Sequence, residues 1–595
     1  MLKLAQQILE QYFGFSSFRS GQKQIIEHVL QRKNALGIMP TGGGKSLCYQ
    51  IPGLVLDGTA IIISPLISLM KDQVDSLTSL GISATYINSS ISHEAQQHRL
   101  RSIAKGSYSF VYVAPERFDS DSFIEVLRTS KLSLIAFDEA HCISQWGHDF
   151  RPSYRSVVQQ LKRIGSLPSV IALTATATED VTADIQRLLS IEQSNVVNTG
   201  FARDNLHFRI VKGKEKRAFI NDYIKSRPNE SGIIYASTRR DVDRIHQWLT
   251  KEGYLVGKYH AGLPEDDRKE AQNAFIQDET TIMVATNAFG MGIDKSNVRY
   301  VIHHSLPMNI ESYYQEAGRA GRDGEPSDCI LLFSAKDIQL QKFLIEQSLM
   351  DEEKKVIEYQ KLQQMVNYCH TDRCLQQYML TYFHDPFDRP ACEICSNCLH
   401  QGELLDITKE AQMILSCVKR MGERFGTGLV AKVLKGSKNQ KVLDGHFHKL
   451  TTYGLLSKWT EKEITQMIQF LTAEGYLAVD DGKFPLLRLT SESLPILKGE
   501  QQVSMLIEAT AAATYADQYD EWLFEQLRTL RKSIAEQNAI PPYIVFSDAT
   551  LKQLAIHKPA SKKDMLTVKG IGEKKYEQYG EAFLEVLQSY SAQTV

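Results

Sequence analysis

Residues 39–46, MPTGGGKS, combine a glycine-rich turn with a lysine and a serine. The stretch follows a short apolar run and precedes a longer periodic one, so it should join a strand to a helix. There, backbone N–H groups can approach phosphate oxygens, the lysine can reach the outer phosphates and the serine can bind a magnesium ion. Met39 replaces the glycine that usually opens such a loop. The predicted phosphate-binding residues are Thr41, Gly42, Gly43, Gly44, Lys45 and Ser46.

An acidic pair, Asp138 and Glu139, ends a second apolar run in LIAFDEAH. A phosphate-binding loop of this kind needs an acid at a strand end to hold magnesium, and Asp138 fits that role. Glu139 can then position the attacking water. Such a pair by itself is as often a solvated turn, but together with Lys45 it predicts hydrolysis of a nucleotide phosphate with Mg²⁺.

The stretch directly after this pair, HCISQWGHDFRPSY, carries aromatic and cationic side chains. Flat rings such as Trp146 and Phe150 can stack on bases with little sequence preference, at about 1–3 kcal/mol per base, and Arg151 can contact a phosphate or stack. Because Glu139 lies only seven residues before Trp146, a ligand that orders this stretch could also shift the attacking water. The alternative is an aromatic patch that packs two lobes together.

Nine cysteines occur in the 595 residues, and four of them lie between positions 374 and 398. A C-x-x-C-x-x-C run can wrap a tetrahedral metal ion, and a further thiolate from a preceding helix can close the site. This clustering favours a structural zinc site in a reducing compartment, although the ligand types also suit an iron–sulfur cluster. Cys369 and His370 are rivals for the fourth position. The predicted ligands are Cys374, Cys392, Cys395 and Cys398.

The elements that must position these residues follow from the hydrophobic pattern. Between about residues 30 and 340, short β-rich runs such as TAIIISP and SGIIYAS alternate with longer amphipathic stretches. This alternation indicates parallel sheets covered by helices, and a polar stretch divides the strands into two sets. We therefore predict an α/β multidomain protein with α/β domains at 1–205 and 206–340. The remainder is predicted to form helical domains at 341–405, 406–492 and 515–595, with a linker at 493–514.

Composition limits the partners of the chain. The net charge is only −2, with 43% hydrophobic and 23% charged residues, so nucleic-acid affinity must come from local patches. Residues 419–449 contain eight Lys or Arg and two acidic residues, which is a candidate footprint for duplex phosphates. In the tail, the turn at Gly570 and Gly572 could hold a phosphate or contact protein. Without a signal peptide or long apolar run, we expect a cytoplasmic protein with no membrane contact.

Several stretches together resemble one family. MPTGGGKS, DEAH, TATAT, YHAGL and YYQEAGRAGRDG occur in the order of superfamily 2 helicase motifs. FGFSSFRSGQ, SPLISLMKDQ and HCISQWGHDFRPSY bring the chain closer to RecQ-type DNA helicases, over nearly its whole length. The resemblance implies two RecA-like lobes, then a zinc-binding helical domain, a winged helix with its wing near residues 480–489, and a helicase-and-RNase-D C-terminal (HRDC) domain.

The resemblance also implies site residues. Phe15 and Arg19 would sandwich the adenine of ATP, and Gln22 would hydrogen-bond its edge. Arg319 and Arg322 would face the γ-phosphate from the second lobe, and their spacing of three suggests one helix face. We favour Arg322 as the residue that stabilises charge in the transition state.

In the same family, the aromatic-rich loop senses single-stranded DNA, which assigns DNA contact to Trp146, Phe150 and Arg151. SPLISLMKDQ, APERF, TATAT and residues 287–295 are similar to motifs that touch the DNA backbone or connect it to the ATP cleft. For the metal site, the resemblance favours zinc, with Cys374 as the fourth ligand. The implied cofactors are therefore ATP, Mg²⁺ and Zn²⁺.

The implied activity is an ATP-dependent 3′ to 5′ DNA helicase that translocates on single-stranded DNA and unwinds duplex or branched DNA in recombination and repair. We expect a monomer, associated with the nucleoid, with single-strand-binding protein and a type I topoisomerase as partners. Two rivals share parts of the pattern. One is an RNA-unwinding DEAH protein, and the other is an ATP-gated module that binds or remodels DNA without separating its strands.

Overall fold

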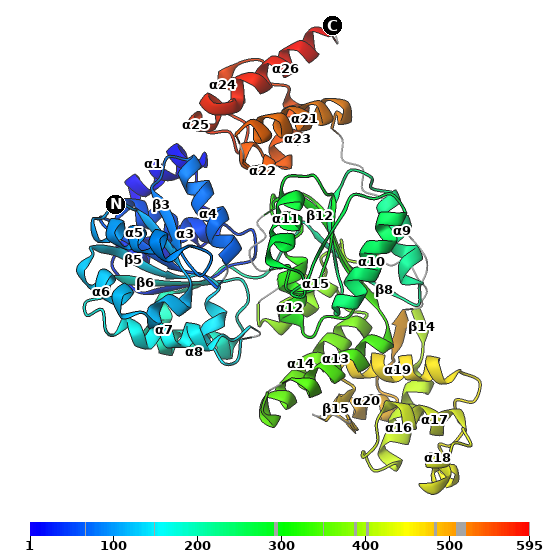
Figure 1. Ribbon diagram of the computed structural model, residues 1–595. Coiled ribbons are helices and arrows are strands. Elements are labelled where there is room, and N and C mark those ends of the chain that lie inside the picture. Colours follow the sequence, from blue (N-terminus) through cyan, green and yellow to red (C-terminus); the bar gives the residue numbers. More distant parts are fainter. Residues whose placement is uncertain are drawn as a thin grey trace.

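The computed structural model describes residues 1–595 except 66, 148, 291–294, 349, 386–388, 400–403, 481–484, 507–518, 539 and 594–595. The described chain forms two α/β lobes side by side, helical and winged domains next to the second lobe, and a separate helical domain that lies over both lobes (Figure 1). This arrangement confirms the predicted fold class. No described helix combines the length and apolarity needed to cross a membrane.

Lobe 1 is built on a parallel sheet. Its strands are almost entirely apolar and buried, as in β2 and β5, because helices cover both faces of the sheet. Among the described residues, the strand order is β3-β4-β2-β5-β6-β1-β7. The strands are β1 (Ala35–Ile38), β2 (Thr59–Ile63), β3 (Ala84–Ile87), β4 (Phe110–Val113), β5 (Leu132–Phe137), β6 (Ser169–Thr174) and β7 (Val196–Asn198). The helices are α1 (Leu2–Phe13), α2 (Gln22–Leu30), α3 (Lys45–Val55), α4 (Ile67–Ser79), α5 (His93–Ala104), α6 (Asp121–Thr129), α7 (Pro152–Leu161) and α8 (Glu179–Leu189).

Lobe 2 repeats the same architecture with a smaller parallel sheet of order β10-β11-β9-β12-β13-β8 in the described chain. The strand β8 begins at the predicted domain boundary. The strands are β8 (Leu206–Lys212), β9 (Ser231–Tyr235), β10 (Val256–Tyr259), β11 (Ile282–Ala285), β12 (Val298–His303) and β13 (Ser327–Phe333). The helices are α9 (Lys216–Lys225), α10 (Arg239–Lys251), α11 (Glu265–Ile276) and α12 (Ile310–Ala317).

The topology of lobe 1 brings the predicted chemistry to one edge. In a parallel sheet, the carboxyl ends of all strands lie at the same edge, where ligands bind. The glycine-rich loop follows β1, the acidic pair follows β5 and TATAT begins at the end of β6. These three strands are consecutive in the sheet, in the order β5-β6-β1. Residues far apart in sequence therefore meet at the carboxyl edge.

A helical segment packs against lobe 2 and shares its core. Phe383 stacks on Phe201 at a centroid distance of 4.5 Å, and Ser396 donates its backbone N–H to the Phe208 carbonyl of β8 at 2.9 Å. The cysteine-rich segment is thereby fixed to the sheet edge. Its helices are α13 (Ala335–Gln347), α14 (Glu352–His370) and α15 (Leu375–Tyr382).

The next domain has the helices and the small antiparallel β15–β16 pair of a winged helix. It is attached to α14 through Glu474, which accepts from Thr371 Oγ1 at 2.8 Å and pairs with Arg373 at 2.8 Å. Residues 481–484 of the predicted wing lie outside the described residues. The elements are β14 (Leu404–Asp406), α16 (Thr408–Arg420), α17 (Thr427–Lys435), α18 (Gln440–Asp444), α19 (Glu461–Ala473), β15 (Leu477–Val479), β16 (Leu487–Leu489), α20 (Ser493–Lys498) and β17 (Ser504–Leu506).

The predicted linker at 493–514 is wrong over its first part. Residues 493–506 form α20 and β17, and β17 pairs with β14 in an antiparallel ladder. Ile496 and Val503 are buried in the core of the winged-helix domain, so this segment closes the domain instead of leaving it. Residues 507–514 lie outside the described residues.

The described part of the C-terminal domain is helical and lies against the two α/β lobes (Figure 1). Toward lobe 1, a Cβ added to Gly14 would lie only 3.3 Å from the Gly572 Cα, so the two backbones are in close contact. Lys574 Nζ lies 3.9 Å from the centroid of the Tyr12 ring. The turn predicted to hold a phosphate or contact protein therefore contacts lobe 1. The helices are α21 (Glu521–Asn538), α22 (Pro542–Val545), α23 (Asp548–His557), α24 (Lys562–Met565), α25 (Glu573–Lys575) and α26 (Glu581–Gln593).

Candidate ATP site, DNA loop and metal centre

The glycine-rich loop joins β1 to α3, as predicted. Gly42 and Gly44 both have φ of 80°, a left-handed conformation that favours glycine. Lys45 Nζ donates to the carbonyls of Met39 at 3.2 Å and Pro40 at 3.3 Å, so the amine is folded back over the loop. Burial lowers the pKa of Lys45, and the nearby carboxylates oppose this shift. The loop thus presents a desolvated cation beside the acidic pair.

The acidic pair lies directly after β5. The Asp138 carboxylate is largely buried and accepts the Glu139 backbone N–H at 3.1 Å. Glu139 has φ of 48°, a backbone conformation that costs a non-glycine residue of order 1 kcal/mol or more. Its carboxylate lies 3.5 Å from His141 Nδ1, and the same nitrogen is 3.0 Å from Thr174 Oγ1 at the start of TATAT. His141 therefore links the acidic pair to the neighbouring strand end.

Tyr154 ties the aromatic-rich loop to the acidic pair. Its side chain is fully buried, and its hydroxyl donates to the Asp138 carbonyl at 2.9 Å and the Ile63 carbonyl at 3.2 Å. Burial raises the pKa of Tyr154, so the hydroxyl remains a donor. One side chain therefore connects the end of this loop to the backbone of Asp138.

Some side chains of the aromatic-rich loop are exposed to solvent, and others are bound to neighbouring protein groups. Trp146 is 51% exposed and Phe150 is half-buried. The Arg151 guanidinium donates to Asp149 Oδ2 at 3.0 and 3.1 Å and to the Pro65 carbonyl at 2.9 Å. Trp146 is therefore available for stacking, whereas Arg151 is held by a carboxylate with which a DNA phosphate would compete.

Of the two predicted arginines of lobe 2, Arg322 lies beside the glycine-rich loop of lobe 1. A Cβ on Gly42 would lie 3.4 Å from Arg322 Cα, which shows how closely the two loops approach. Arg319 is 4% exposed and lies against Gly290 within lobe 2. The prediction that both share a helix face is wrong, because α12 ends at Ala317 and the arginines follow in consecutive turns. We call residues 318–324 the arginine turn.

The residues predicted to hold adenine lie together beside the glycine-rich loop. Gln22 Nε2 donates to the carbonyls of Gly43 at 3.3 Å and Gly44 at 3.1 Å, and its Oε1 accepts the Arg19 N–H at 2.8 Å. Phe15, Arg19 and Gln22 line a single cavity of about 1280 Å³. The opposite wall of this cavity comes from the C-terminal domain, through residues 566–577.

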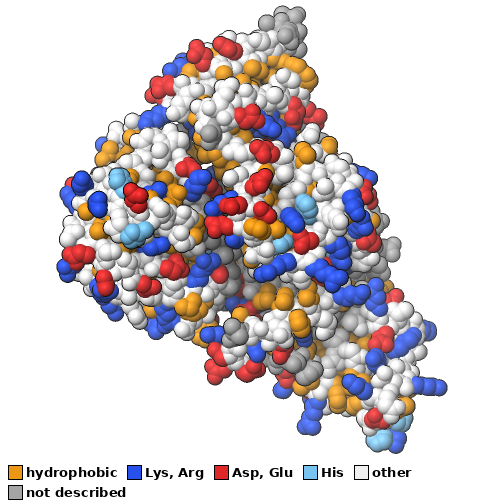
Figure 2. All heavy atoms as spheres, in the orientation of Figure 1, with side chains coloured by type: hydrophobic (Ala, Val, Ile, Leu, Met, Phe, Trp, Pro, Cys, Tyr) orange, Lys and Arg blue, Asp and Glu red, His pale blue; other side chains and the backbone are white. Residues whose placement is uncertain are grey.

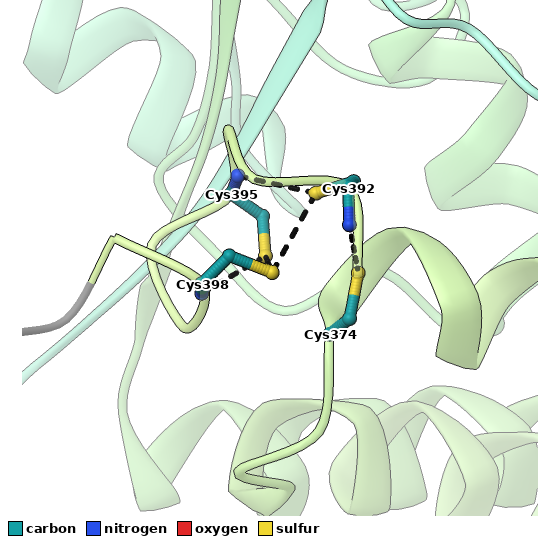
Figure 3. Close-up of side chains that lie close together, drawn as sticks. All are labelled: Cys374, Cys392, Cys395 and Cys398. Carbon is teal, nitrogen blue, oxygen red and sulfur yellow. Dashed lines mark hydrogen bonds between the residues drawn. The ribbon is translucent and has the colours of Figure 1, made fainter. Parts of the chain in front are cut away.

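The four predicted thiol ligands converge at one point (Figure 3). Their sulfurs all lie within 4.8 Å of one another, and Sγ of Cys398 is 3.4 Å from Cys395 and 3.8 Å from Cys392. Tetrahedral zinc with Zn–S bonds of 2.3 Å requires sulfur separations of about 3.8 Å, so the geometry fits zinc. Among the described residues, Cys369 and His370 are absent from this group. The Cys374 ligand thus comes from the N-terminus of α15.

Backbone N–H groups further support thiolates in the cluster. Cys374 Sγ accepts from Cys392 N at 3.3 Å and Gln377 N at 3.4 Å, and Cys395 Sγ accepts from Leu375 N at 3.4 Å. Hydrogen bonds to a thiolate favour the charged form that binds metal. The residues present therefore suit a closed structural Zn²⁺ site.

One contact residue escaped the sequence prediction. Arg203 lies in the polar stretch between the lobes and hydrogen-bonds to both the glycine-rich loop and the arginine turn. No local pattern marks it, because an exposed-looking Arg in a polar connection is ordinary. Only its position between the two lobes shows its importance.

Family models match the chain along almost its whole length. They are DEAD/DEAH box helicase at residues 19–185, Helicase conserved C-terminal domain at 215–324, RecQ zinc-binding at 335–399, RQC domain at 401–513 and HRDC domain at 520–587.

Two parallel-sheet lobes with a shared phosphate-binding cleft, joined to these domains, define an ATP-driven helicase motor. The chain is 50% identical to ATP-dependent DNA helicase RecQ of Bacillus subtilis (strain 168), over 100% of both chains. Identity to the protein of the same name from Pasteurella multocida (strain Pm70) is 40%, over 98% of this chain and 93% of that one. The chain belongs to the RecQ family of ATP-dependent DNA helicases. An RNA-unwinding DEAH protein and a non-unwinding module are not favoured.

Proposed function

We propose that the chain moves 3′ to 5′ along single-stranded DNA and unwinds duplex or branched DNA for recombination and repair. The motion is driven by ATP hydrolysis between the two lobes. The observation that supports this most is the approach of the arginine turn to the glycine-rich loop, with 3.4 Å between Arg322 Cα and a Cβ position on Gly42. A nucleotide in this cleft would contact both lobes, so its hydrolysis can change their separation.

On the proposed assignment, Phe15 and Arg19 stack on the adenine and Gln22 hydrogen-bonds its edge. All three line the same cavity beside Gly44, which supports this role. The loop residues Thr41, Gly42, Gly43, Gly44, Lys45 and Ser46 hold the phosphates.

Asp138 and Ser46 are the proposed magnesium ligands, and a bound ion would neutralise charge on the phosphates. Glu139 orients the attacking water and accepts its proton. Arg322 stabilises the charge that develops on the transferred phosphate, while the buried Arg319 braces the arginine turn. The strained backbone of Glu139 supports a functional role, since strain is retained where the surroundings fix a residue for chemistry.

For DNA, we propose that Trp146 and Phe150 stack on bases and that Arg151 exchanges Asp149 for a phosphate. The bond from Tyr154 to the Asp138 carbonyl would carry the resulting loop movement to the catalytic pair. The winged-helix domain would contact the duplex, because Lys and Arg side chains project from it (Figure 2).

The remaining assignments rest on the family resemblance alone. They are a monomer in the cytoplasm, associated with the nucleoid, and contacts with single-strand-binding protein and a type I topoisomerase. Size-exclusion chromatography with light scattering tests the oligomeric state.

The proposed activity is tested with Glu139→Gln, measured for ATP hydrolysis with and without single-stranded DNA or RNA. Strand displacement is followed on 3′-tailed and 5′-tailed duplexes. We expect DNA to stimulate the wild type more than RNA does, and only the 3′-tailed duplex to be unwound. The variant should lose about 10²- to 10⁴-fold in hydrolysis, as expected for removal of a general base, while still binding nucleotide.

Glu94→Gln, an exposed change on α5 of the same lobe, serves as the matched control and should behave as wild type. Equal stimulation by RNA would contradict DNA specificity. Unwinding of the 5′-tailed duplex would contradict the polarity, and hydrolysis without displacement would contradict the helicase activity.

A further inference from the structure

Arg203 lies where the chain passes from lobe 1 to lobe 2, between β7 and β8. Its guanidinium binds both sides of the cleft. Nη1 donates to the Thr41 carbonyl of the glycine-rich loop. The other contacts go to three carbonyls of the arginine turn, with Nη1 to Gly318 at 3.4 Å and Nη2 to Ala320 at 3.1 Å and Gly321 at 2.8 Å. One side chain thus spans the two catalytic loops.

The segment around Arg203 is anchored on the lobe 2 side. Asn205 Nδ2 donates at 2.9 Å to both Gly321 and Glu325 carbonyls, and Asn205 Oδ1 accepts from Arg203 Nε at 3.4 Å. The Tyr314 hydroxyl, from α12, donates to the Phe201 carbonyl at 2.7 Å. Because these contacts fix the segment to lobe 2, the bond to Thr41 reports the position of lobe 2 relative to the glycine-rich loop.

The surroundings of Arg203 are rich in positive charge. Arg19, Arg322 and Lys45 gather around the same loop, and burial together with the Arg19 and Arg322 charges lowers the pKa of Arg203. A guanidinium nevertheless stays protonated, so its charge must be met by acceptors. The planar fork reaches four carbonyls at fixed angles, which the single ammonium of lysine cannot reproduce.

We infer that Arg203 is a positioning residue for ATP hydrolysis, which holds the arginine turn at a set distance from the glycine-rich loop. The inference rests on the proposed role of Arg322. Arg203 binds the carbonyl oxygen of Thr41. The backbone N–H groups of the glycine-rich loop and the Lys45 ammonium therefore remain able to bind the phosphates. Its loss should therefore shift the arginine turn without removing the groups that bind nucleotide. A displacement of about 1 Å in such a group can reduce a rate by about 10²-fold.

The test compares Arg203→Gln and Arg203→Lys with Arg209→Gln. Arg209 lies on β8 of the same segment, where its guanidinium packs on Phe219 at 5.5 Å, away from the cleft. For each variant we would measure DNA-stimulated kcat and KM, the Kd of a non-hydrolysable ATP analogue, and the melting temperature. We expect Arg203→Gln to lower kcat by about 10- to 100-fold with analogue Kd changed less than about threefold. Arg203→Lys should retain part of the rate.

A double variant with Arg322→Ala separates positioning from general destabilisation. If Arg203 acts through the arginine turn, the double variant is no slower than the slower single variant. The inference is overturned if Arg203→Gln matches Arg209→Gln, if kcat and nucleotide affinity fall together, or if the two effects multiply. Wild-type kcat in Arg322→Ala alone would overturn the proposed role of Arg322. The inference would fall with that role, whereas a slow Arg322→Ala beside a wild-type Arg203→Gln would overturn the inference alone.

Discussion

At the scale of single residues, the acidic pair depends on bonds from outside its own segment. Glu139 adopts a left-handed backbone conformation, and Asp138 is held through its carbonyl by the buried hydroxyl of Tyr154. Strained conformations persist only when surrounding contacts fix them. The hydroxyl of Tyr154 therefore helps to fix the backbone that carries the two carboxylates.

Tyr154→Phe removes that hydroxyl while keeping the ring. The Asp138 carbonyl loses its donor, whereas the Ile63 carbonyl still accepts the Asp138 N–H at 2.9 Å, and this loss should destabilise lobe 1 by about 1–3 kcal/mol. We expect a lower melting temperature and weaker stimulation of hydrolysis by DNA. Tyr108→Phe, at a partly buried tyrosine of the same lobe, is the control. An unchanged melting temperature and unchanged stimulation in Tyr154→Phe would show that these bonds do not matter.

At the scale of elements, the aromatic-rich loop runs from an exposed tryptophan to a tyrosine buried beside the acidic pair. Trp146 is exposed at the surface of the loop, while Tyr154 at its far end is buried against β5. Between them, Arg151 is held by Asp149 and by the Pro65 carbonyl that follows β2. A ligand on the exposed part can therefore alter contacts at the carboxyl edge of the sheet.

Trp146→Ala should remove most of the stimulation of ATP hydrolysis by DNA without changing nucleotide affinity. The loss of one stacking platform corresponds to about 1–3 kcal/mol of DNA binding. Steady-state hydrolysis titrated with single-stranded DNA measures the effect. Trp522→Ala is the matched control, because Trp522 is similarly exposed at 56% but lies in the C-terminal domain. If DNA stimulated ATP hydrolysis by Trp146→Ala as strongly as by the wild type, the proposed DNA contact at Trp146 would be wrong. The aromatic-rich loop would then serve only to pack the protein.

The four-cysteine cluster should hold its segment to lobe 2 by binding zinc. Cys395→Ser should lose zinc and lower the melting temperature, because the loop of Cys395 is attached to β8 through Ser396. Metal content is measured by atomic absorption. Cys369→Ala provides the control, since Cys369 is buried but outside the cluster, and this variant should keep its zinc. Zinc loss in Cys369→Ala would contradict the ligand set.

At the scale of the whole molecule, the C-terminal domain bridges the two lobes. It meets lobe 1 at Gly14 and lobe 2 through the Lys552–Glu325 ion pair at 2.6 Å and an Arg528 bond to the Asn229 carbonyl at 3.1 Å. Both members of the ion pair are partly shielded from water, so the charges matter more than those of an exposed pair.

Lys552→Glu places two carboxylates opposite each other and should release the C-terminal domain from lobe 2. The expected result is a larger radius of gyration in small-angle X-ray scattering. The exchanged pair, Lys552→Glu with Glu325→Lys, should restore compactness. Lys558→Glu is the control, because Lys558 pairs with Asp520 inside the same domain. If Lys552→Glu and its control scatter alike, this ion pair does not hold the domain in place.

Much of the fold and part of the site could be predicted from sequence. The glycine-rich loop, the acidic pair and the C-x-x-C-x-x-C run are encoded by contiguous residues whose backbone chemistry is local. The apolar strands likewise reveal parallel sheets. The folding of residues 493–506 was missed, because the short β17 is stabilised only by its distant partner β14.

The sequence by itself determined the glycine-rich loop, the acidic pair and the cysteine cluster, because each is encoded largely by neighbours along the chain. The tertiary structure alone decided that Arg203 spans the two lobes, that Arg319 and Arg322 lie in turns, and that the C-terminal domain lines the same cavity as Phe15, Arg19 and Gln22. The contacts of Arg203 and of the C-terminal domain join residues separated by more than one hundred positions, and their energy depends on how whole lobes pack.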